Sequence, residues 1–279
     1  MAFLSDLQSS PFLAPSLATS LLAAGVCGIL GPLVVTRRIV FLCDGVSHAA
    51  IFGVGLGLAL HHAFPGLPAF ISPTALALAT ALLCALALAW LHGRAPARMD
   101  AMIGGLLAAG LSGGVLLANL VPGNRTGLMD ALLGNLSTAG WAQAGWMAGL
   151  LALLLALLAV FYKQLLALCV DEQQLKLQGG RTFWIHALLL AMVACSVVAL
   201  MQLVGGLLAI ALIALPAATA GLFRARLPGM MLLAAVICAA EVTLPRILAY
   251  GTPVAPGPAI VLSAGLVFLL ALAIRKLAR

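Results

Sequence analysis

Long apolar stretches, separated by short segments that contain glycine, proline or charged residues, run through nearly the whole chain. An α-helix needs about 20 apolar residues to cross the hydrocarbon core of a bilayer. By this length we predict nine membrane-spanning helices: Leu13–Val35, Ile39–Leu60, Ala69–Leu91, Met102–Val121, Gly145–Tyr162, Trp184–Leu203, Leu207–Phe223, Met230–Leu248 and Ala259–Ile274. The predicted fold class is an all-α polytopic membrane protein, with a single transmembrane domain over residues 1–279.

The sixth and seventh spans are not separated by any polar segment. Their apolar run of ~40 residues would extend ~60 Å as one helix at 1.5 Å per residue. The hydrocarbon core of a bilayer is only about 30 Å thick. We therefore expect the chain to turn at Gly205-Gly206, because glycine permits a tight turn at low steric cost.

The basic residues indicate the orientation of the helices. With the N-terminus outside and the C-terminus inside, the outer segments hold only Arg125 and Arg246 of the 14 lysines and arginines, and the inner segments hold the other twelve. Cytoplasmic loops of membrane proteins carry such an excess of positive charge. Fusing the sixth and seventh spans would place Arg224 and Arg226 outside, so the charges favour nine spans. Ten spans with a broken helix is the alternative left open.

The composition excludes soluble proteins. Hydrophobic residues make up 64% of the 279 residues and charged residues 8%, against about 25% charged residues in typical soluble domains. The net charge of +7 comes from scattered basic residues whose places follow the topology, so we predict a lipid environment and no nucleic-acid partner. The six cysteines stand singly in or beside apolar runs, as small buried hydrophobic residues do. The chain has no GxxxxGK[ST] motif, so any ATP would bind to another subunit.

Two segments are predicted not to span. Within the outer segment 125–144, Leu128–Leu136 is too short to cross a bilayer, which predicts a re-entrant or interfacial segment. The inner segment 163–181 is the longest polar stretch. From Asp171 to Gly179 it predicts a short cytoplasmic helix with acidic residues first, a lysine later and a glycine stop, an order that suits the helix dipole. An ordinary solvated loop helix explains the same pattern.

Asp44 and His48 are ionisable residues inside the second predicted span. They are four residues apart and so share one face of the helix. Counted from Arg37-Arg38 at 1.5 Å per residue, they lie ~10–16 Å into the membrane. A carboxylate and an imidazole together suit a divalent transition metal, and a weak site of few ligands suits an ion in transit. A proton relay and a structural hydrogen-bonded pair are the alternatives.

Further polar residues have weaker signals. Glu241 lies well inside the eighth span and is a candidate second site on the pathway, or else a carboxyl group that is protonated or bonded to a neighbouring helix. His61-His62, at the outer end of the second span, either collect metal from a donor or have no special role. Pro216 is expected to kink the seventh span, and the small residues after it, through Ala220, allow close helix packing.

Four motifs stand in order over roughly residues 25–275. They are the stretch from Arg37-Arg38 through Asp44 and His48 to Gly53 and Gly57, the stretch from Asp171 to Gly179, the stretch from Val204-Gly205-Gly206 to Leu215-Pro216-Ala217-Ala218-Thr219-Ala220, and the turn Gly251-Thr252-Pro253 to Gly257-Pro258. Together they resemble the membrane permease of bacterial zinc, manganese and iron uptake ABC transporters. No single motif is decisive, but four in the family's order are specific.

The resemblance implies a type II ABC importer-like permease that works as a homodimer with its pore on the two-fold axis. Asp44 and His48 match the pair that the family places in the translocation path. Two cytosolic ABC ATPase subunits would dock on the helix at 171–179, and an extracytoplasmic metal-binding protein would deliver the ion. The residues that the resemblance assigns to ATPase coupling are Asp171, Glu172, Gln174, Leu175, Lys176 and Gly179, and those that it assigns to helix kinking and packing are Gly205, Gly206, Pro216 and Thr219.

The chain departs from the family pattern at four places, one of which is the Thr252-Pro253 turn, about one residue longer than in the family. Leu175 stands where the family often has a small residue, and Glu241 stands where it usually has a neutral or small one. The fourth span has Ser112 in a stretch where some zinc-type members carry a histidine, which weakens zinc slightly as the cargo.

We therefore predict a non-enzymatic transport subunit in the bacterial cytoplasmic membrane. It would import a divalent transition metal, Zn²⁺ or Mn²⁺ first and Fe²⁺ next, with ATP hydrolysed on the partner subunit and no tightly bound cofactor. Asp and His ligands suit all three metals. The alternatives are a proton-coupled secondary carrier that uses Asp44, His48 and Glu241 as a relay, and an ABC permease for a metal chelate. A membrane scaffold would leave these three residues unexplained.

Overall fold

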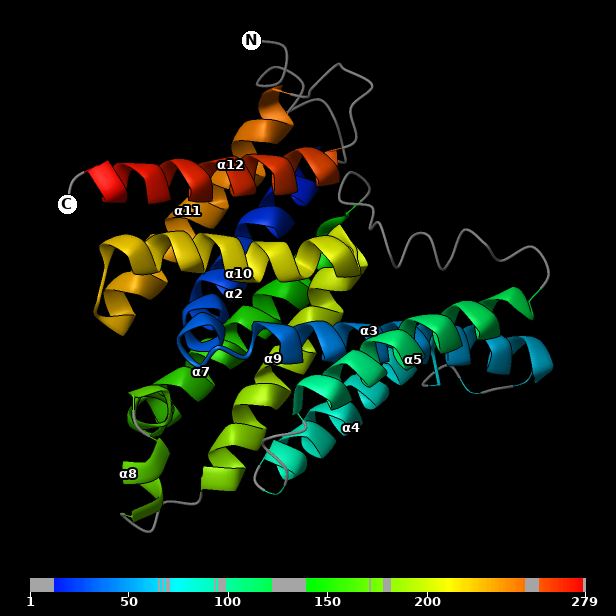
Figure 1. Ribbon diagram of the computed structural model, residues 1–279. Helices are drawn as coiled ribbons and strands as arrows, with labels where there is room; N and C mark the ends of the chain where they lie inside the picture. The colour runs from blue at the N-terminus through cyan, green and yellow to red at the C-terminus, as the bar shows by residue number, and fades with distance from the viewer. Residues whose placement is uncertain are drawn as a thin grey trace. The chain divides into compact units, whose positions relative to one another are not determined.

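The computed structural model describes residues 13–64, 66, 68, 71–92, 94, 99–121, 139–170, 172–177, 182–248 and 256–277. Every regular element among these residues is a helix (Figure 1). The helices are α2 (Leu13–Thr36), α3 (Val40–Ala63), α4 (Pro73–His92), α5 (Met99–Asn119), α7 (Trp141–Val170), α8 (Glu172–Leu177), α9 (Thr182–Val204), α10 (Gly206–Phe223), α11 (Leu227–Leu248) and α12 (Pro256–Leu277). The predicted all-α class is confirmed.

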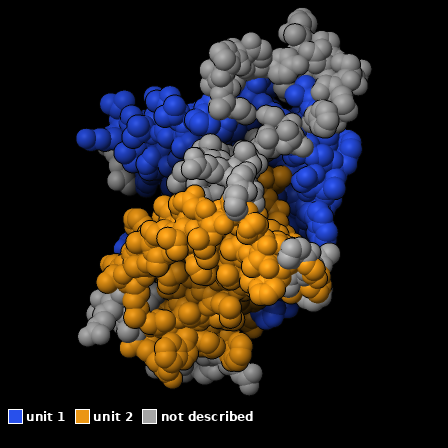
Figure 2. Space-filling view, turned by 90° about the vertical axis from the view of Figure 1, so that its right-hand side faces the viewer, with its two compact units in different colours: residues 1–38, 135–162, 208–279 blue, residues 39–134, 163–207 orange. Residues whose placement is uncertain are grey.

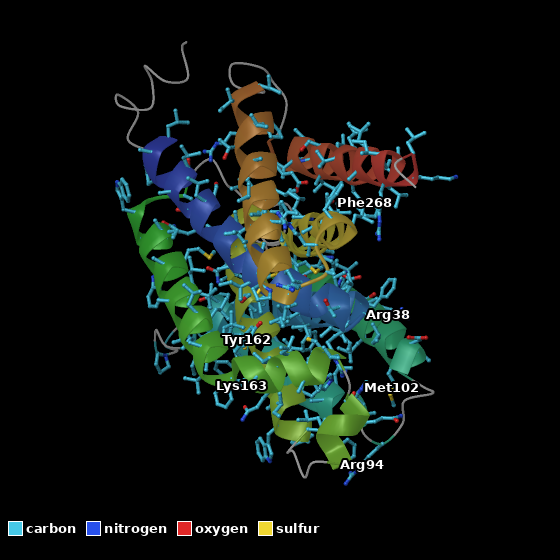
Figure 3. All side chains as sticks on the ribbon, turned by 90° about the vertical axis from the view of Figure 1, so that its left-hand side faces the viewer. Arg38, Arg94, Met102, Tyr162, Lys163 and Phe268 are labelled. Carbon is cyan, nitrogen blue, oxygen red and sulfur yellow. The ribbon has the colours of Figure 1, made fainter. Side chains whose placement is uncertain are left out.

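All nine predicted spans are present as helices. Eight are long and apolar enough to cross a bilayer, and the ninth, α10, is a shorter apolar helix. Helix α7 extends beyond the predicted Gly145–Tyr162 at both ends, because leucine, alanine and other good helix formers continue on either side. Tyr162 and Lys163, labelled in Figure 3, therefore both belong to α7.

The two predicted non-spanning segments are described only in part. Helix α7 takes in residues 141–144 of the outer segment and residues 163–170 of the inner one. Leu128–Leu136 lies outside the described residues, as do Asp171 and 178–181. Helix α8 occupies the remaining described part of the inner segment, where a short helix was expected.

The predicted turn between the sixth and seventh spans is confirmed. Helix α9 ends at Val204 and α10 begins at Gly206. Gly205 between them has φ 89°, and its N–H donates a hydrogen bond of 2.9 Å to the carbonyl of Met201. Residues with a side chain rarely adopt this left-handed conformation, which explains the glycine at this position.

Replacing Gly205 with alanine is expected to destabilise the protein by about 1–2 kcal/mol, because a Cβ makes the left-handed conformation unfavourable. The measurement is the thermal unfolding midpoint in detergent. Gly149→Ala is the matched control, since Gly149 is helical and a Cβ there would meet nothing within 4 Å. Equal midpoints for the two variants would contradict the role of Gly205.

The helices form two compact units, coloured separately in Figure 2. Unit 1 comprises Met1–Arg38, Asn135–Tyr162 and Leu208–Arg279, and unit 2 comprises Ile39–Gly134 and Lys163–Leu207. The boundary between the units falls inside the first of the four motifs. Arg37-Arg38 ends the first segment of unit 1, and Asp44 and His48 belong to unit 2. A single domain over 1–279 stays a prediction.

Helix α3 is the centre of unit 2, where it contacts α4, α5 and α9. Glycines allow these helices to approach closely. A Cβ built on Gly53 would lie 2.6 Å from the Cα of Ala77 in α4, and one built on Gly110 of α5 would lie 2.6 Å from the carbonyl oxygen of His48. Gly114 packs in the same way against the backbone of Ile51.

In unit 1, α11 contacts both α2 and α12. A Cβ on Gly28 would lie 2.6 Å from the Cα of Ala235. The side chain of Arg246 is buried, and its guanidinium donates hydrogen bonds to the hydroxyls of Ser16 and Ser20 in α2, the second at 3.3 Å. These bonds satisfy a cation inside an apolar bundle, where an unpaired charge is costly.

Candidate metal-transfer site

Asp44 and His48 lie one turn apart on α3, as predicted from their spacing. The Nδ1 atom of His48 is 3.0 Å from the backbone carbonyl oxygen of Asp44 and 3.4 Å from its Oδ1 atom. The Asp44 side chain is 29% exposed and that of His48 13%. The pair is therefore accessible to a small ion yet largely enclosed by protein.

The contact at Nδ1 decides which atom of His48 can bind a ligand. A hydrogen on Nδ1 is donated to the Asp44 carbonyl, which leaves Nε2 with its lone pair for a metal. An imidazole whose other nitrogen donates to a carbonyl is the usual arrangement of a metal-binding histidine. The carboxylate of Asp44 supplies oxygen ligands from the same helix face.

Among the described residues, a single chain supplies only Asp44 and His48 as ligands at this site. Within the described ranges, no group of three or more His, Cys, Asp or Glu side chains could hold a metal ion. The thiol of the neighbouring Cys43 is buried and donates instead to the carbonyl of Ile39 at 3.3 Å. A four-ligand site would need ligands from outside the described residues of one chain.

Small residues around α3 fix the position of the pair. Because Gly110 has no side chain, α5 packs directly against the backbone of α3 at His48. Gly206 also faces α3, with a built Cβ 3.2 Å from the Ser47 hydroxyl oxygen. The packing role predicted for Gly206 therefore has a physical basis. Gly110 and Gly114, four residues apart, were missed by the sequence reasoning, although their spacing is a signal of close helix packing.

Glu241 is buried in α11, with 4% of its surface exposed. Neither carboxylate oxygen has a hydrogen-bond partner among the described residues. The guanidinium of Arg246 is hydrogen-bonded to Ser16 and Ser20 instead. Glu241 belongs to unit 1, and the Asp44–His48 pair belongs to unit 2.

The two histidines in the last turn of α3 differ from one another. The Nε2 atom of His61 is 2.7 Å from the carbonyl oxygen of Ile71 and so joins the end of α3 to the segment before α4. His62 is exposed. A structural hydrogen bond thus accounts for His61, and a metal-collecting role for the two histidines stays untested.

The proline in α10 is accommodated without a break in the helix. Pro216 has no N–H to donate to the carbonyl of Leu212. The thiol of Cys238 in α11 approaches that carbonyl at 3.9 Å, and the Thr219 hydroxyl donates to the carbonyl of Leu215 at 2.9 Å. The predicted packing function of Pro216 and Thr219 is consistent with these contacts.

The residues predicted for ATPase coupling are described unevenly. Asp171 and Gly179 lie outside the described residues, and so do the side chains of Gln174 and Lys176. Glu172 begins α8, and its Oε2 atom is 3.6 Å from Nε2 of His92. Leu175 is buried, at 8% exposure, so its side chain packs within the permease.

Comparison with known proteins gives a consistent result. The sequence model of the ABC 3 transport family matches residues 9–275. The manganese import system permease protein ScaB of Streptococcus gordonii is 29% identical, with 96% of this chain and 92% of that protein covered. The high-affinity zinc uptake system membrane protein ZnuB of Haemophilus influenzae is 28% identical over 92% and 95% of the two chains.

A solved structure agrees with these relatives. A chain of PsaBC from Streptococcus pneumoniae, determined in complex with a Fab, superposes with a TM-score of 0.84 at 30% identity, and 97% of this chain and 94% of that chain are covered. The family match extends over nearly the whole chain and includes all nine spans. The chain therefore belongs to the ABC 3 transport family, whose relatives named above are metal-uptake permeases, and it is a multi-pass protein of the bacterial cytoplasmic membrane.

Proposed function

We propose that this permease imports a divalent transition metal ion, zinc or manganese, by ATP-driven alternating access, and that Asp44 and His48 meet the ion on its way. The observation that carries the proposal is the geometry of the pair. Nδ1 of His48 is held by the Asp44 carbonyl, so Nε2 and the carboxylate are left for the ion within a transmembrane helix.

A second copy of the chain completes the site. Two ligands per chain are too few for a closed metal site, whereas a two-fold homodimer brings two carboxylates and two imidazoles to one axis. Four ligands supplied by two chains can separate when the dimer changes state. Such a site binds strongly enough for entry and weakly enough for release.

Zinc and manganese are the first candidates for the cargo. Nitrogen and oxygen donors accept both ions, and also Fe²⁺. ScaB is a manganese import permease and ZnuB a zinc uptake protein. The similarity of this chain to the two is nearly equal, at 29% and 28% identity, and does not favour one metal over the other.

Energy and delivery would come from partner proteins. Because the sequence has no GxxxxGK[ST] motif, ATP would be bound and hydrolysed by two separate cytosolic subunits docked on α8 and the adjoining residues 171–179. Leu175 would support α8 from the permease side. With the N-terminus outside and the C-terminus inside, an extracytoplasmic binding protein would deliver the metal at the opposite face.

Glu241 is a candidate second site on the pathway. Its support is a buried carboxylate with no partner among the described residues. Inside a membrane protein such a group is a functional candidate by default.

Metal accumulation in cells tests the proposal. Cells that express the chain with its cognate ATPase subunit are compared with cells that lack the ATPase, and zinc, manganese and iron are measured in parallel. We expect one metal to rise, and only with the ATPase. A rise that persists without the ATPase would favour a proton-coupled carrier, and no rise in any metal with both subunits present would refute the proposal.

A further inference from the structure

Two histidines at the cytoplasmic end of unit 2 have no part in the site described above. His92 is the last residue of α4, and His186 lies near the start of α9. Their rings are stacked, with centroids 4.6 Å apart and planes inclined by 25°. His186 is almost fully buried, at 3% exposure, so its ring is fixed by packing and restricts the position of the stacked His92 ring.

The stacked ring of His92 also reaches α8. Its Nε2 atom lies 3.6 Å from Oε2 of Glu172, the first residue of that helix. Helix α8 contacts α9 as well, beside which it lies in Figure 1. The neighbouring cation, Arg94, is placed over the ring of Trp90, 4.1 Å from its centroid. Three helices thus meet at His92, and one of them is the proposed docking element.

Helix α4 also contacts α3, the helix of the Asp44–His48 pair, at Thr80, twelve residues before His92. The hydroxyl of Thr80 lies 2.9 Å from the carbonyl oxygen of Ala49, the residue after His48, and at 2.9 and 3.0 Å from the carbonyl oxygens of Leu76 and Ala77 in its own helix. At this level Gly53 of α3 packs directly on the backbone of α4 at Ala77. The two helices cannot slide past each other here without the loss of both contacts.

From these contacts we propose that α4 links α8 to the metal pair, with His92 and Thr80 as its two positioning residues. The proposal deepens the proposed function, because it rests on α8 as the ATPase docking element. Twelve residues of α-helix form a stiff rod of about 18 Å. A displacement of α8 is passed to α4 through Glu172 and His92, and from α4 to the backbone beside His48 through Thr80.

The partly exposed His92–Glu172 pair contributes little to stability, since ion pairs in contact with solvent rarely do. Its removal is therefore expected to leave the fold intact and to change the transmission of movement. This difference allows a positioning role to be separated from a structural one.

The test uses the complete permease–ATPase complex in proteoliposomes. Uptake of radioactive zinc or manganese and release of phosphate are measured together, which gives the ATP hydrolysed per ion. For His92→Ala and for Thr80→Val we expect this ratio to rise between about twofold and thirtyfold, the range of coupling changes produced by such substitutions, with an unchanged unfolding midpoint. The exchange variant H92E/E172H is expected to lower the ratio toward the wild-type value.

Leu83→Ala is the matched control, since Leu83 lies on α4 between Thr80 and His92 and its side chain is exposed. If His92→Ala fails to assemble, His92→Gln is measured in its place with the same expectation. An unchanged ratio in the His92 variants, or an exchange variant no better than the single variants, would overturn the α4 link. A wild-type complex that takes up neither metal would instead refute the proposed function.

Discussion

Asp44→Asn or His48→Ala is expected to lower metal uptake by at least about 100-fold. Replacing a residue that only orients a metal ligand already costs about 10–100-fold in metal affinity, and these two substitutions remove a ligand itself. The new side chains, asparagine and alanine, are no larger than those they replace. Neither substitution changes the glycine contacts through which α3 packs. Assembly should therefore remain normal. Uptake of zinc and manganese by cells, together with the amount of ATPase that copurifies with the permease, measures the two properties separately.

Phe64→Ala, directly after the same helix, serves as the control. It removes an exposed side chain at the end of α3 and is expected to retain uptake. The double variant Asp44→Ala/His48→Ala with wild-type uptake would exclude the pair from the pathway. Normal uptake in either single variant would contradict the role predicted for the residue that it replaces.

The second large effect is expected at Gly110. A Cβ there would lie 2.6 Å from the carbonyl oxygen of His48, which belongs to the backbone and cannot move aside cheaply. Gly110→Leu is expected to destabilise the protein by about 1–3 kcal/mol or more, as overpacking does in well-packed cores, and to abolish uptake by separating α5 from α3. Unfolding midpoints in detergent and the yield of folded protein measure the effect.

Gly104→Ala is the matched control on the same helix. A Cβ at Gly104 would meet nothing within 4 Å, and alanine is the better helix former. We expect this variant to be as stable as the wild type or slightly more so. Similar midpoints for Gly110→Leu and Gly104→Ala would mean that α3 and α5 do not pack through these glycines.

Much of the fold was predictable from the sequence, because apolar length alone determines where a membrane helix can form. The turn at Gly205 was predictable for the same reason, since one crossing cannot contain the apolar run around it. The ends of α7 were not, because helix formers continue past Tyr162 and sequence gives no stop signal there.

The candidate site was predictable in its local part only. The spacing of Asp44 and His48 fixes a common helix face, and the 3.4 Å separation confirms it. The partners of Arg246 were not predictable, because Ser16 and Ser20 are more than 200 residues away in the chain. The contact of His92 with Glu172 likewise depends on how α4 and α8 pack, which no local pattern specifies.

The central claim is that the Asp44–His48 pair carries a metal ion through an ATP-driven permease. Its most direct test is uptake of radioactive zinc and manganese into proteoliposomes that contain the purified permease–ATPase complex, with and without ATP, for the wild type and for Asp44→Ala/His48→Ala. We expect uptake of at least one ion by the wild type with ATP, and none without ATP or in the double variant. Uptake that persists in the double variant, or without ATP, would contradict the account.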